Sequence, residues 1–182
     1  MLESESQPTP PRSSPVGSAV REILETIIPA VLLALLISLF VAQGTYVEGQ
    51  SMEPNLHNEQ RLIVEKVSYR LHPPRRGDIV VINVEFSDVP LIKRVIGLPG
   101  ETVEVHDGRV FIDGQPLDEP YLPALFMRDY GPAQVPEGHI FVMGDNRGAS
   151  NDSRAFGPVS QESIVGRAWV SYWPPDEIRL LK

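Results

Sequence analysis

Residues 102–112 read Thr-Val-Glu-Val-His-Asp-Gly-Arg-Val-Phe-Ile, and this stretch decides the class of fold. At its centre, Asp107-Gly108 supplies the positive φ angles that a two-residue hairpin turn requires. The stretch therefore predicts two antiparallel strands, Thr102–Val105 and Arg109–Ile112, joined by a tight turn. A second Asp-Gly pair at 113–114 closes the second strand.

Further strands are expected on both sides of this hairpin, because short runs rich in Val, Ile and Leu recur between turn residues. They are Arg61–Val67, Ile79–Glu85, Leu91–Ile96, His139–Met143 and Ser163–Tyr172. No helix of ten or more residues with a 3.6-residue period is expected after residue 50. Eighteen Pro and 14 Gly residues also disfavour a helical bundle. The sequence thus predicts a mainly β domain.

One segment of this domain is rich in proline. Residues Gln115–Glu137 contain five prolines, which restrict the backbone and remove hydrogen-bond donors. We expect this segment to be an extended excursion on the surface, formed as a loop or a small subdomain.

An uncharged apolar segment precedes the β-rich part. The 22 residues between Glu25 and Glu48 carry no charge, and residues 27–42 read IIPAVLLALLISLFVA. As a helix the 22 residues would be about 33 Å long, close to the roughly 30 Å thickness of a bilayer core. They predict a single transmembrane anchor helix over residues 23–44. A cleaved signal peptide is the alternative, but its apolar run is usually only about 7 to 15 residues long.

The residues before the anchor suggest its orientation. Residues 1–22 are rich in Ser and Pro and are expected to form a disordered tail. Arg12 and Arg21 precede the apolar segment, whereas no Lys or Arg follows it until Arg61. By the positive-inside tendency, the N-terminus is cytoplasmic and residues 45–182 form an extracytoplasmic domain.

The composition excludes several functions. Of the 182 residues, 24 are acidic and 16 basic, which gives a net charge of −8 and argues against binding to nucleic acid. The chain has no cysteine, so it has no disulfide, no thiol nucleophile, no zinc-thiolate site and no iron–sulfur cluster.

Ser51 lies in the segment Glu48–Leu56, a few residues beyond the expected membrane surface. The hydrolase elbow G-x-S-x-G is absent, because Glu53 occupies its last position. Taken alone, a serine after Gly-Gln is more often a turn residue than a nucleophile. As a nucleophile it would need a positioned base, either a His or a neutral Lys. The four histidines (57, 72, 106 and 139) have no companion acid at a telling spacing.

Lys93 is the candidate base. It lies in an otherwise aliphatic strand and, with a period of two, shares a face with Leu91 and Val95, whereas Arg94 faces the opposite way. Burial among apolar side chains lowers the pKa of a lysine from its ordinary value of about 10.4. The alternative is a lysine whose stem packs while its ammonium reaches water.

A third segment, Met143–Val159, is dense in small polar and charged residues and is expected to be a loop held by side-chain hydrogen bonds. A calcium loop beginning at Asp145 is excluded, because Arg147 and Phe156 occupy positions that need oxygen ligands. A solvated turn remains an alternative, with Asp152 and Arg154 forming a surface ion pair.

In this order, the segments resemble those of the bacterial type I signal peptidases, which are membrane-anchored Ser–Lys endopeptidases. The resemblance runs from the anchor to about Val170. Five motifs carry it: G-x-S-M-x-P at 49–54, R-G-D-I-V-V at 76–81, K-R-V-I-G-L-P-G at 93–100, D-G-x-P-L-x-E-P-Y at 113–121 and G-D-N-R…S-x-D-S-R…G at 144–157.

The resemblance implies roles for individual residues. Ser51 is implied to be the nucleophile and Lys93 the general base, with Ser150 orienting the lysine nitrogen by a hydrogen bond. Asp152 and Arg154 are implied to buttress the loop that bears Ser150. One position departs from the Gram-negative pattern: Gly49 stands where that pattern has a serine that helps to stabilise the oxyanion. The backbone N–H of Ser51 remains as an oxyanion donor.

The resemblance also implies the substrate and the location. The substrate is the signal peptide of an exported preprotein, bound as an added β-strand with small side chains at the −1 and −3 positions. No metal, nucleotide or other cofactor is implied. The expected location is the outer surface of a plasma membrane, with a thylakoid-type membrane as the alternative. Lys93 favours a prokaryotic or organellar source, because the counterparts in the endoplasmic reticulum use His.

Two other classes of function are alternatives. The first is a self-cleaving Ser–Lys regulator, which would be cytosolic and carry a DNA-binding module; the apolar segment and the charge of −8 oppose it. The second is a catalytically silent, membrane-tethered binding domain. The contact between Ser51 and Lys93 separates an enzyme from this second alternative, and the sequence alone does not establish that contact or the oligomeric state.

Overall fold

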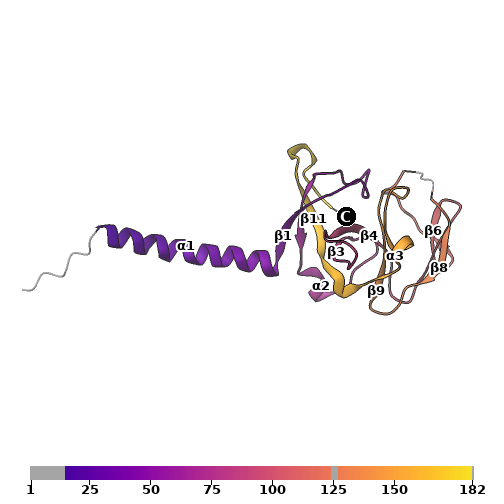
Figure 1. Ribbon diagram of the computed structural model, residues 1–182, viewed down its shortest axis with the longest axis horizontal. Coiled ribbons are helices and arrows are strands. Elements are labelled where there is room, and N and C mark those ends of the chain that lie inside the picture. Colours follow the sequence, from indigo (N-terminus) through magenta and orange to yellow (C-terminus); the bar gives the residue numbers. More distant parts are fainter. Residues whose placement is uncertain (1–14, 124–126, 182) are drawn as a thin grey trace, which may run out of the picture. The chain divides into compact units, whose positions relative to one another are not determined.

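The computed structural model describes residues 15–123 and 127–181, and the contacts divide the chain into two units, Met1–Ser38 and Leu39–Lys182. The described part of the first unit lies in helix α1, Pro15–Phe40, which Figure 1 shows as one long helix and whose last two residues count with the second unit. Within it, Val20–Phe40 has a mean hydropathy of 2.5 and is long and apolar enough to cross a membrane. This helix is compatible with membrane anchoring.

The helix has other limits than those expected. It begins at Pro15, so residues 15–22 are helical and not disordered, while residues 1–14 lie outside the described residues. Proline is favourable at the first helical position, and Arg21 forms an ion pair of 2.6 Å with Glu25 one turn later. The helix ends at Phe40, and the residues that follow are taken up by a strand.

The second unit is mainly β, as predicted. An antiparallel sheet has the order β1 (Ala42–Tyr46), β2 (Arg61–Glu65), β11 (Ile164–Trp173), β3 (Ile79–Ile82), β4 (Leu91–Gly97), β9 (His139–Met143) and β10 (Val159–Ser160), with β12 (Arg179–Leu180) also paired to β11. A smaller antiparallel sheet has the order β7 (Gln115–Pro116), β6 (Arg109–Ile112), β5 (Thr102–His106) and β8 (Tyr130–Gln134). In Figure 1, β6 and β8 lie on the side of this domain away from β1 and β11.

The hairpin predicted from residues 102–112 is confirmed. Strands β5 and β6 pair through Val105 and Val110, and Asp107 and Gly108 have φ angles of 51° and 70°. The other expected strands are also present, with limits that differ by a few residues. The helices that follow α1 are single turns: α2 (Ser68–Leu71), α3 (Ser153–Phe156), η1 (Gln161–Ser163) and η2 (Pro175–Glu177).

The Pro-rich segment 115–137 is only partly the surface excursion that was expected. Its end forms strand β8, which pairs with β5 at the edge of the smaller sheet, and Val135 beyond it is fully buried. An edge strand accepts Pro132 because one side of it needs no ladder hydrogen bonds. Because of these prolines, strand β8 was not predicted from the sequence.

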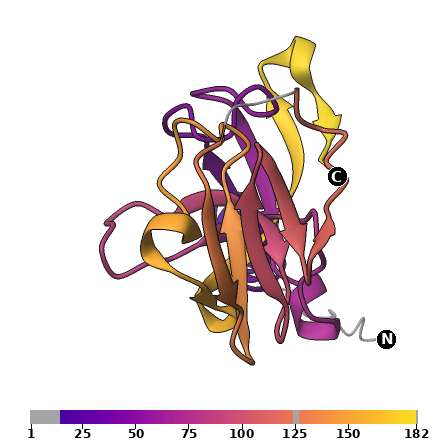
Figure 2. The ribbon, with the colours of Figure 1, turned by 90° about the vertical axis from the view of Figure 1, so that its right-hand side faces the viewer.

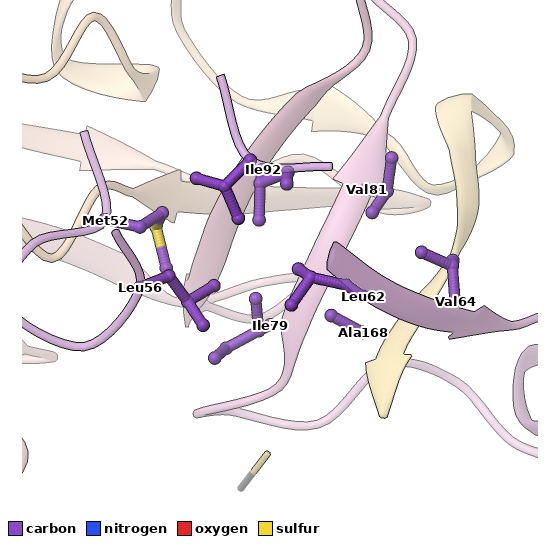
Figure 3. Packing of buried hydrophobic residues seen from close by; sticks show 9 residues of the cluster. Met52, Leu56, Leu62, Val64, Ile79, Val81, Ile92 and Ala168 are labelled. Carbon is purple, nitrogen blue, oxygen red and sulfur yellow. The ribbon is translucent and has the colours of Figure 1, made fainter. Parts of the chain in front are cut away.

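Three hydrophobic clusters hold the domain together. The first joins the β1–β2 loop to β2, β3, β4 and β11, and Figure 3 shows Met52 and Leu56 of that loop among Leu62, Ile79 and Ile92. The second fills the space between the two sheets, and the third covers the other face of β3, β4 and β9. The β1–β2 loop is thus attached to the core through its own side chains.

Gly97 lies at the end of β4, where the two sheets approach closely. A Cβ at this position would lie 2.5 Å from Val103 Cγ2 and 3.0 Å from Phe141 Cβ. Val103 belongs to the smaller sheet and Phe141 to the larger one, so only a residue without a side chain allows the two to meet here.

We expect Gly97→Ala to lower the free energy of unfolding by about 2 kcal/mol, because the added methyl group overpacks the space between the sheets. Thermal unfolding of the full chain in detergent measures this. The control is Gly148→Ala, where a Cβ would meet nothing within 4 Å. Equal stability of the two variants would contradict the prediction.

Candidate active site

Ser51 lies in the loop between β1 and β2, and the loop is closed at its base. Val47 donates from its N–H to the carbonyl of Gln60 at 2.8 Å, and the N–H of Glu59 donates to the carbonyl of Val47 at 2.8 Å. Next to Ser51, the side chain of Met52 is fully buried in the first hydrophobic cluster. The nucleophile candidate is therefore held by its neighbour in sequence.

Lys93 lies in β4, an interior strand of the larger sheet, and is only 3% exposed. Its cross-strand partner on β3 is Val80, which belongs to the third hydrophobic cluster together with Val95 and the partly buried Leu91. The expected apolar surroundings are thus confirmed. Lys93 Nζ lies 2.8 Å from Ser51 Oγ, within hydrogen-bonding distance.

The surroundings lower the pKa of Lys93. Burial disfavours the ammonium and brings the pKa from the ordinary value of 10.5 to about 8, although the carboxylates of Asp152 and Asp145 oppose this shift. An amine with this pKa is neutral in a useful fraction of molecules near neutral pH. A neutral amine beside a serine hydroxyl can remove its proton and make it a nucleophile.

The loop after β9 is clamped to the segment that bears Ser51. The N–H of Asn146 donates to the carbonyl of Ser51 at 3.0 Å, and its side chain donates to the carbonyl of Gln50 at 3.1 Å. Gly144 permits this approach, because a Cβ there would lie 2.4 Å from the Ser51 carbonyl oxygen and 2.3 Å from Ser150 Oγ. The segment that bears Ser51, strand β4 with Lys93 and the loop after β9 are far apart in sequence and meet at this site.

Asp152 and Arg154 form a buried ion pair inside this loop, so the alternative of a solvated surface pair is wrong. The Arg154 side chain donates twice to the Asp152 carboxylate at 2.8 Å, and Asp152 is fully buried. Burial alone would raise the pKa of Asp152, but the hydrogen bonds from Arg154 and from the Gly144 N–H outweigh it and lower this pKa. The pair fixes the loop from within.

Ser150 is close to the site but does not make the expected hydrogen bond to Lys93. Among the described residues its buried hydroxyl has no hydrogen-bond partner, but it lies near enough to the Asp152 carboxylate to help lower the pKa of that group. Its role toward Lys93 stays a prediction.

Sequence reasoning missed a polar cluster behind the lysine. Arg94 donates to both carboxylate oxygens of Asp145 at 2.8 and 2.7 Å, and its guanidinium lies 4.0 Å from the centre of the Tyr121 ring. Asn55 donates from one amide nitrogen to Asp145 at 2.8 Å and to the carbonyl of Tyr121 at 2.9 Å. Arg94 and Asp145 lay inside recognised motifs, but no spacing indicated that they would pair.

The Pro-rich excursion also reaches this site. Arg147 of the β9–α3 loop is 2% exposed and donates to Glu119 at 2.8 Å. Together with the contacts of Tyr121, this buried ion pair attaches residues 117–121 to the loop.

The two oxyanion candidates differ in their availability. The N–H of Gly49 donates to the side chain of Asn58 at 2.7 Å and is thereby occupied. Among the described residues, no hydrogen bond uses the N–H of Ser51. Within the same residues, no group of three His, Cys, Asp or Glu side chains could hold a metal ion.

In this antiparallel β domain a buried lysine amine lies within hydrogen-bonding distance of a serine hydroxyl, and such a pair can activate a nucleophile. The family model described as "Signal peptidase, peptidase S26" matches residues 20–173. The signal peptidase I of Leptolyngbya laminosa is 43% identical, with 97% of this chain and 96% of that protein covered. The "Probable signal peptidase I-2" of Synechocystis sp. is 44% identical, with 93% and 81% covered.

A solved structure is also similar, that of a signal peptidase I from Enterococcus faecalis. It is 37% identical, covers 53% of this chain and 97% of its own, and has a TM-score of 0.48. From the family model and the curated relatives, the chain belongs to the signal peptidase family, peptidase S26. The resemblance seen in the five sequence motifs is thereby confirmed.

We expect Arg154→Ala to lower the free energy of unfolding at pH 7 by about 3 kcal/mol, since it leaves the Asp152 carboxylate buried and unpaired. In the parent chain, the lowered pKa of Asp152 gives stability that is present above its unfolded value of about 3.9 and is lost as the pH falls through the folded value. In the variant, burial raises this pKa. Denaturant unfolding should therefore show that the difference in free energy of unfolding between the parent chain and Arg154→Ala becomes smaller as the pH falls.

Arg154→Lys is the matched control, because it keeps the charge but loses the two-point contact, and it should be intermediate. A difference between parent and Arg154→Ala that stays constant from pH 7 to pH 4 would contradict this account of the pair.

Proposed function

We propose that this chain removes the signal peptides of exported preproteins, with Ser51 as the nucleophile and Lys93 as the general base. The observation that carries the proposal is the 2.8 Å contact between Lys93 Nζ and Ser51 Oγ at a lysine that is almost fully buried. The family to which the chain belongs, and the signal peptidases among its relatives, supply the substrate class.

In the first half of the reaction, neutral Lys93 takes the proton of Ser51 while Ser51 Oγ attacks the scissile carbonyl carbon. The free N–H of Ser51 is the proposed donor to the developing oxyanion. When the C–N bond breaks, the Lys93 ammonium returns the proton to the leaving amine. The signal peptide then remains attached to Ser51 as an ester.

In the second half, Lys93 removes a proton from a water molecule that attacks the ester carbonyl. Ser51 leaves, regains a proton from Lys93, and the cleaved signal peptide departs. Asp152 and Arg154 have a supporting role, because their ion pair shapes the loop that contacts the Ser51 carbonyl. We assign Ser150 the orientation of Lys93, because its hydroxyl is buried in the loop that contacts Ser51 and has no other hydrogen-bond partner among the described residues.

The proposed site of action is the outer surface of a membrane. Helix α1 would anchor the chain, and the basic residues Arg12 and Arg21 favour a cytoplasmic N-terminus. Residues 45–182 would then meet the preprotein where its signal peptide leaves the bilayer, and the mature protein would be released on that side.

Removing either member of the pair should abolish turnover. We expect Ser51→Ala and Lys93→Arg each to lower the rate of preprotein cleavage by about a thousandfold or more, because nucleophile and base act as a unit. Arginine keeps the positive charge but cannot give up its proton, so it separates a base from an electrostatic role. Cleavage by the full chain in phospholipid vesicles measures both.

Lys66→Arg is the matched control, the same substitution at another lysine, and it should cleave at the parental rate. If a folded Lys93→Arg variant also did so, Lys93 would not be the base. If the parent chain cleaved no preprotein, the catalytically silent binding domain would be the better account.

The rate should also depend on pH. Because only neutral Lys93 can accept a proton, kcat/KM should rise tenfold per pH unit on the acid side and level off above a pH of about 8, the pKa of Lys93. Rates of preprotein cleavage from pH 6 to pH 10 test this. A rate that is constant across this range would show that the ionisation of Lys93 does not control the reaction.

A further inference from the structure

The segment after β11 turns back onto the sheet; we call residues 174–181 the strap. It forms η2 (Pro175–Glu177) and then β12 (Arg179–Leu180), which pairs antiparallel to β11. Figure 2 shows this hairpin in yellow at the top of the domain. The N–H of Leu181 donates to the carbonyl of Trp169 at 2.9 Å, and the Leu181 side chain packs against the first hydrophobic cluster, so backbone pairing and apolar contact both attach the strap to the sheet.

Two charged side chains of the strap leave it and contact the β1–β2 loop that bears Ser51. The Glu177 carboxylate accepts a hydrogen bond from the side-chain amide of Gln60, and the Arg179 guanidinium donates to the backbone carbonyl of Asn55. Neither contact is needed to pair the strap with β11. Both contacts instead restrain the β1–β2 loop.

Gln60 closes the base of that loop. Its backbone carbonyl accepts from Val47, and its side-chain oxygen accepts from the N–H of His57 at 3.0 Å. Because Gln60 is only 1% exposed, the nitrogen of the same amide needs a buried partner, which Glu177 supplies. Glu177 thus fixes the amide in the orientation that presents its oxygen to the loop.

Asn55 joins the loop to the strand of the lysine. Its side chain contacts Asp145, and Asp145 pairs with Arg94, the neighbour of Lys93. Arg179 donates to the backbone carbonyl of the same Asn55. One contact from the strap therefore acts at the base of the Ser51 loop, and the other acts where the loop meets the lysine side of the site.

We propose that Glu177 and Arg179 are positioning residues, which hold the β1–β2 loop so that Ser51 stays within reach of Lys93. This rests on the proposed function of the Ser51–Lys93 pair. Neither side chain needs to touch substrate. Since a displacement of about 1 Å at reacting atoms can cost up to a hundredfold in rate, loosening the loop should lower kcat and leave KM unchanged.

The experiment compares the full chain in phospholipid vesicles with Glu177→Ala, Arg179→Ala and Glu177→Gln. We expect each alanine variant to lower kcat for preprotein cleavage by about tenfold, with KM within about twofold of the parent. Glu177→Gln should restore kcat, because its amide oxygen still accepts from Gln60. Asp176→Ala, which removes an exposed carboxylate from the same turn, is the matched control and should behave as the parent.

Two further measurements separate positioning from general stability. The melting temperature of the alanine variants should stay within a few degrees of the parent, and the pH at which kcat/KM is half-maximal should move upward, since a loosened loop admits water to Lys93. The proposal is overturned if the alanine variants keep the parental kcat, or if Glu177→Gln fails like Glu177→Ala and both lose activity in proportion to their loss of stability.

Ser51→Ala in the same assay keeps the two proposals apart. An inactive Ser51→Ala with unimpaired strap variants would overturn only the positioning role. An active Ser51→Ala would overturn the proposed nucleophile, and the positioning role with it.

Discussion

The site depends on the burial of one lysine side chain in the middle of a sheet. An ammonium group is costly to remove from water, and Lys93 is 3% exposed among aliphatic side chains. The fold tolerates this because the amine can lose its proton and because Ser51 Oγ lies 2.8 Å away. The same desolvation that costs stability gives the lysine a pKa of about 8. Stability and chemical reactivity are thus opposed at this residue, as is common at catalytic sites.

The surrounding structure keeps water away and holds the serine in place. Met52 and Ile92, the neighbours of Ser51 and Lys93, belong to one hydrophobic cluster, so the packing that stabilises the domain also sets the distance between the two functional groups (Figure 3). Buried ion pairs then fix the orientation of side chains and loops, which apolar packing does not specify. Such pairs give directional contacts, and the two-point contact of Arg94 with Asp145 defines the orientation of the β9–α3 loop more sharply than apolar contact would.

Much of the fold was readable from the sequence, and the errors have physical causes. Asp107-Gly108 identified its hairpin because positive φ angles belong to few residue types. Strand β8 was missed because it contains Pro132, which disfavours a central strand but not an edge. The first turns of α1 were missed because the Ser- and Pro-rich composition of residues 1–22 favours disorder, although proline is accepted at the first position of a helix, where Pro15 lies.

The sequence by itself determined the apolar helix, the β-rich class, and Ser51 and Lys93 as candidates, because these follow from local composition, periodicity and residue chemistry. It also carried the five motifs through which the chain resembles its family. Only the tertiary structure decided that the serine and the lysine touch, that Asp152 is buried, that Ser150 makes no hydrogen bond to Lys93, and that Glu177 and Arg179 reach the loop of Ser51. The reason is that 42 residues separate Ser51 from Lys93, and 117 separate Gln60 from Glu177. Contacts at such separations are set by strand order and register, which no local stretch of the chain encodes.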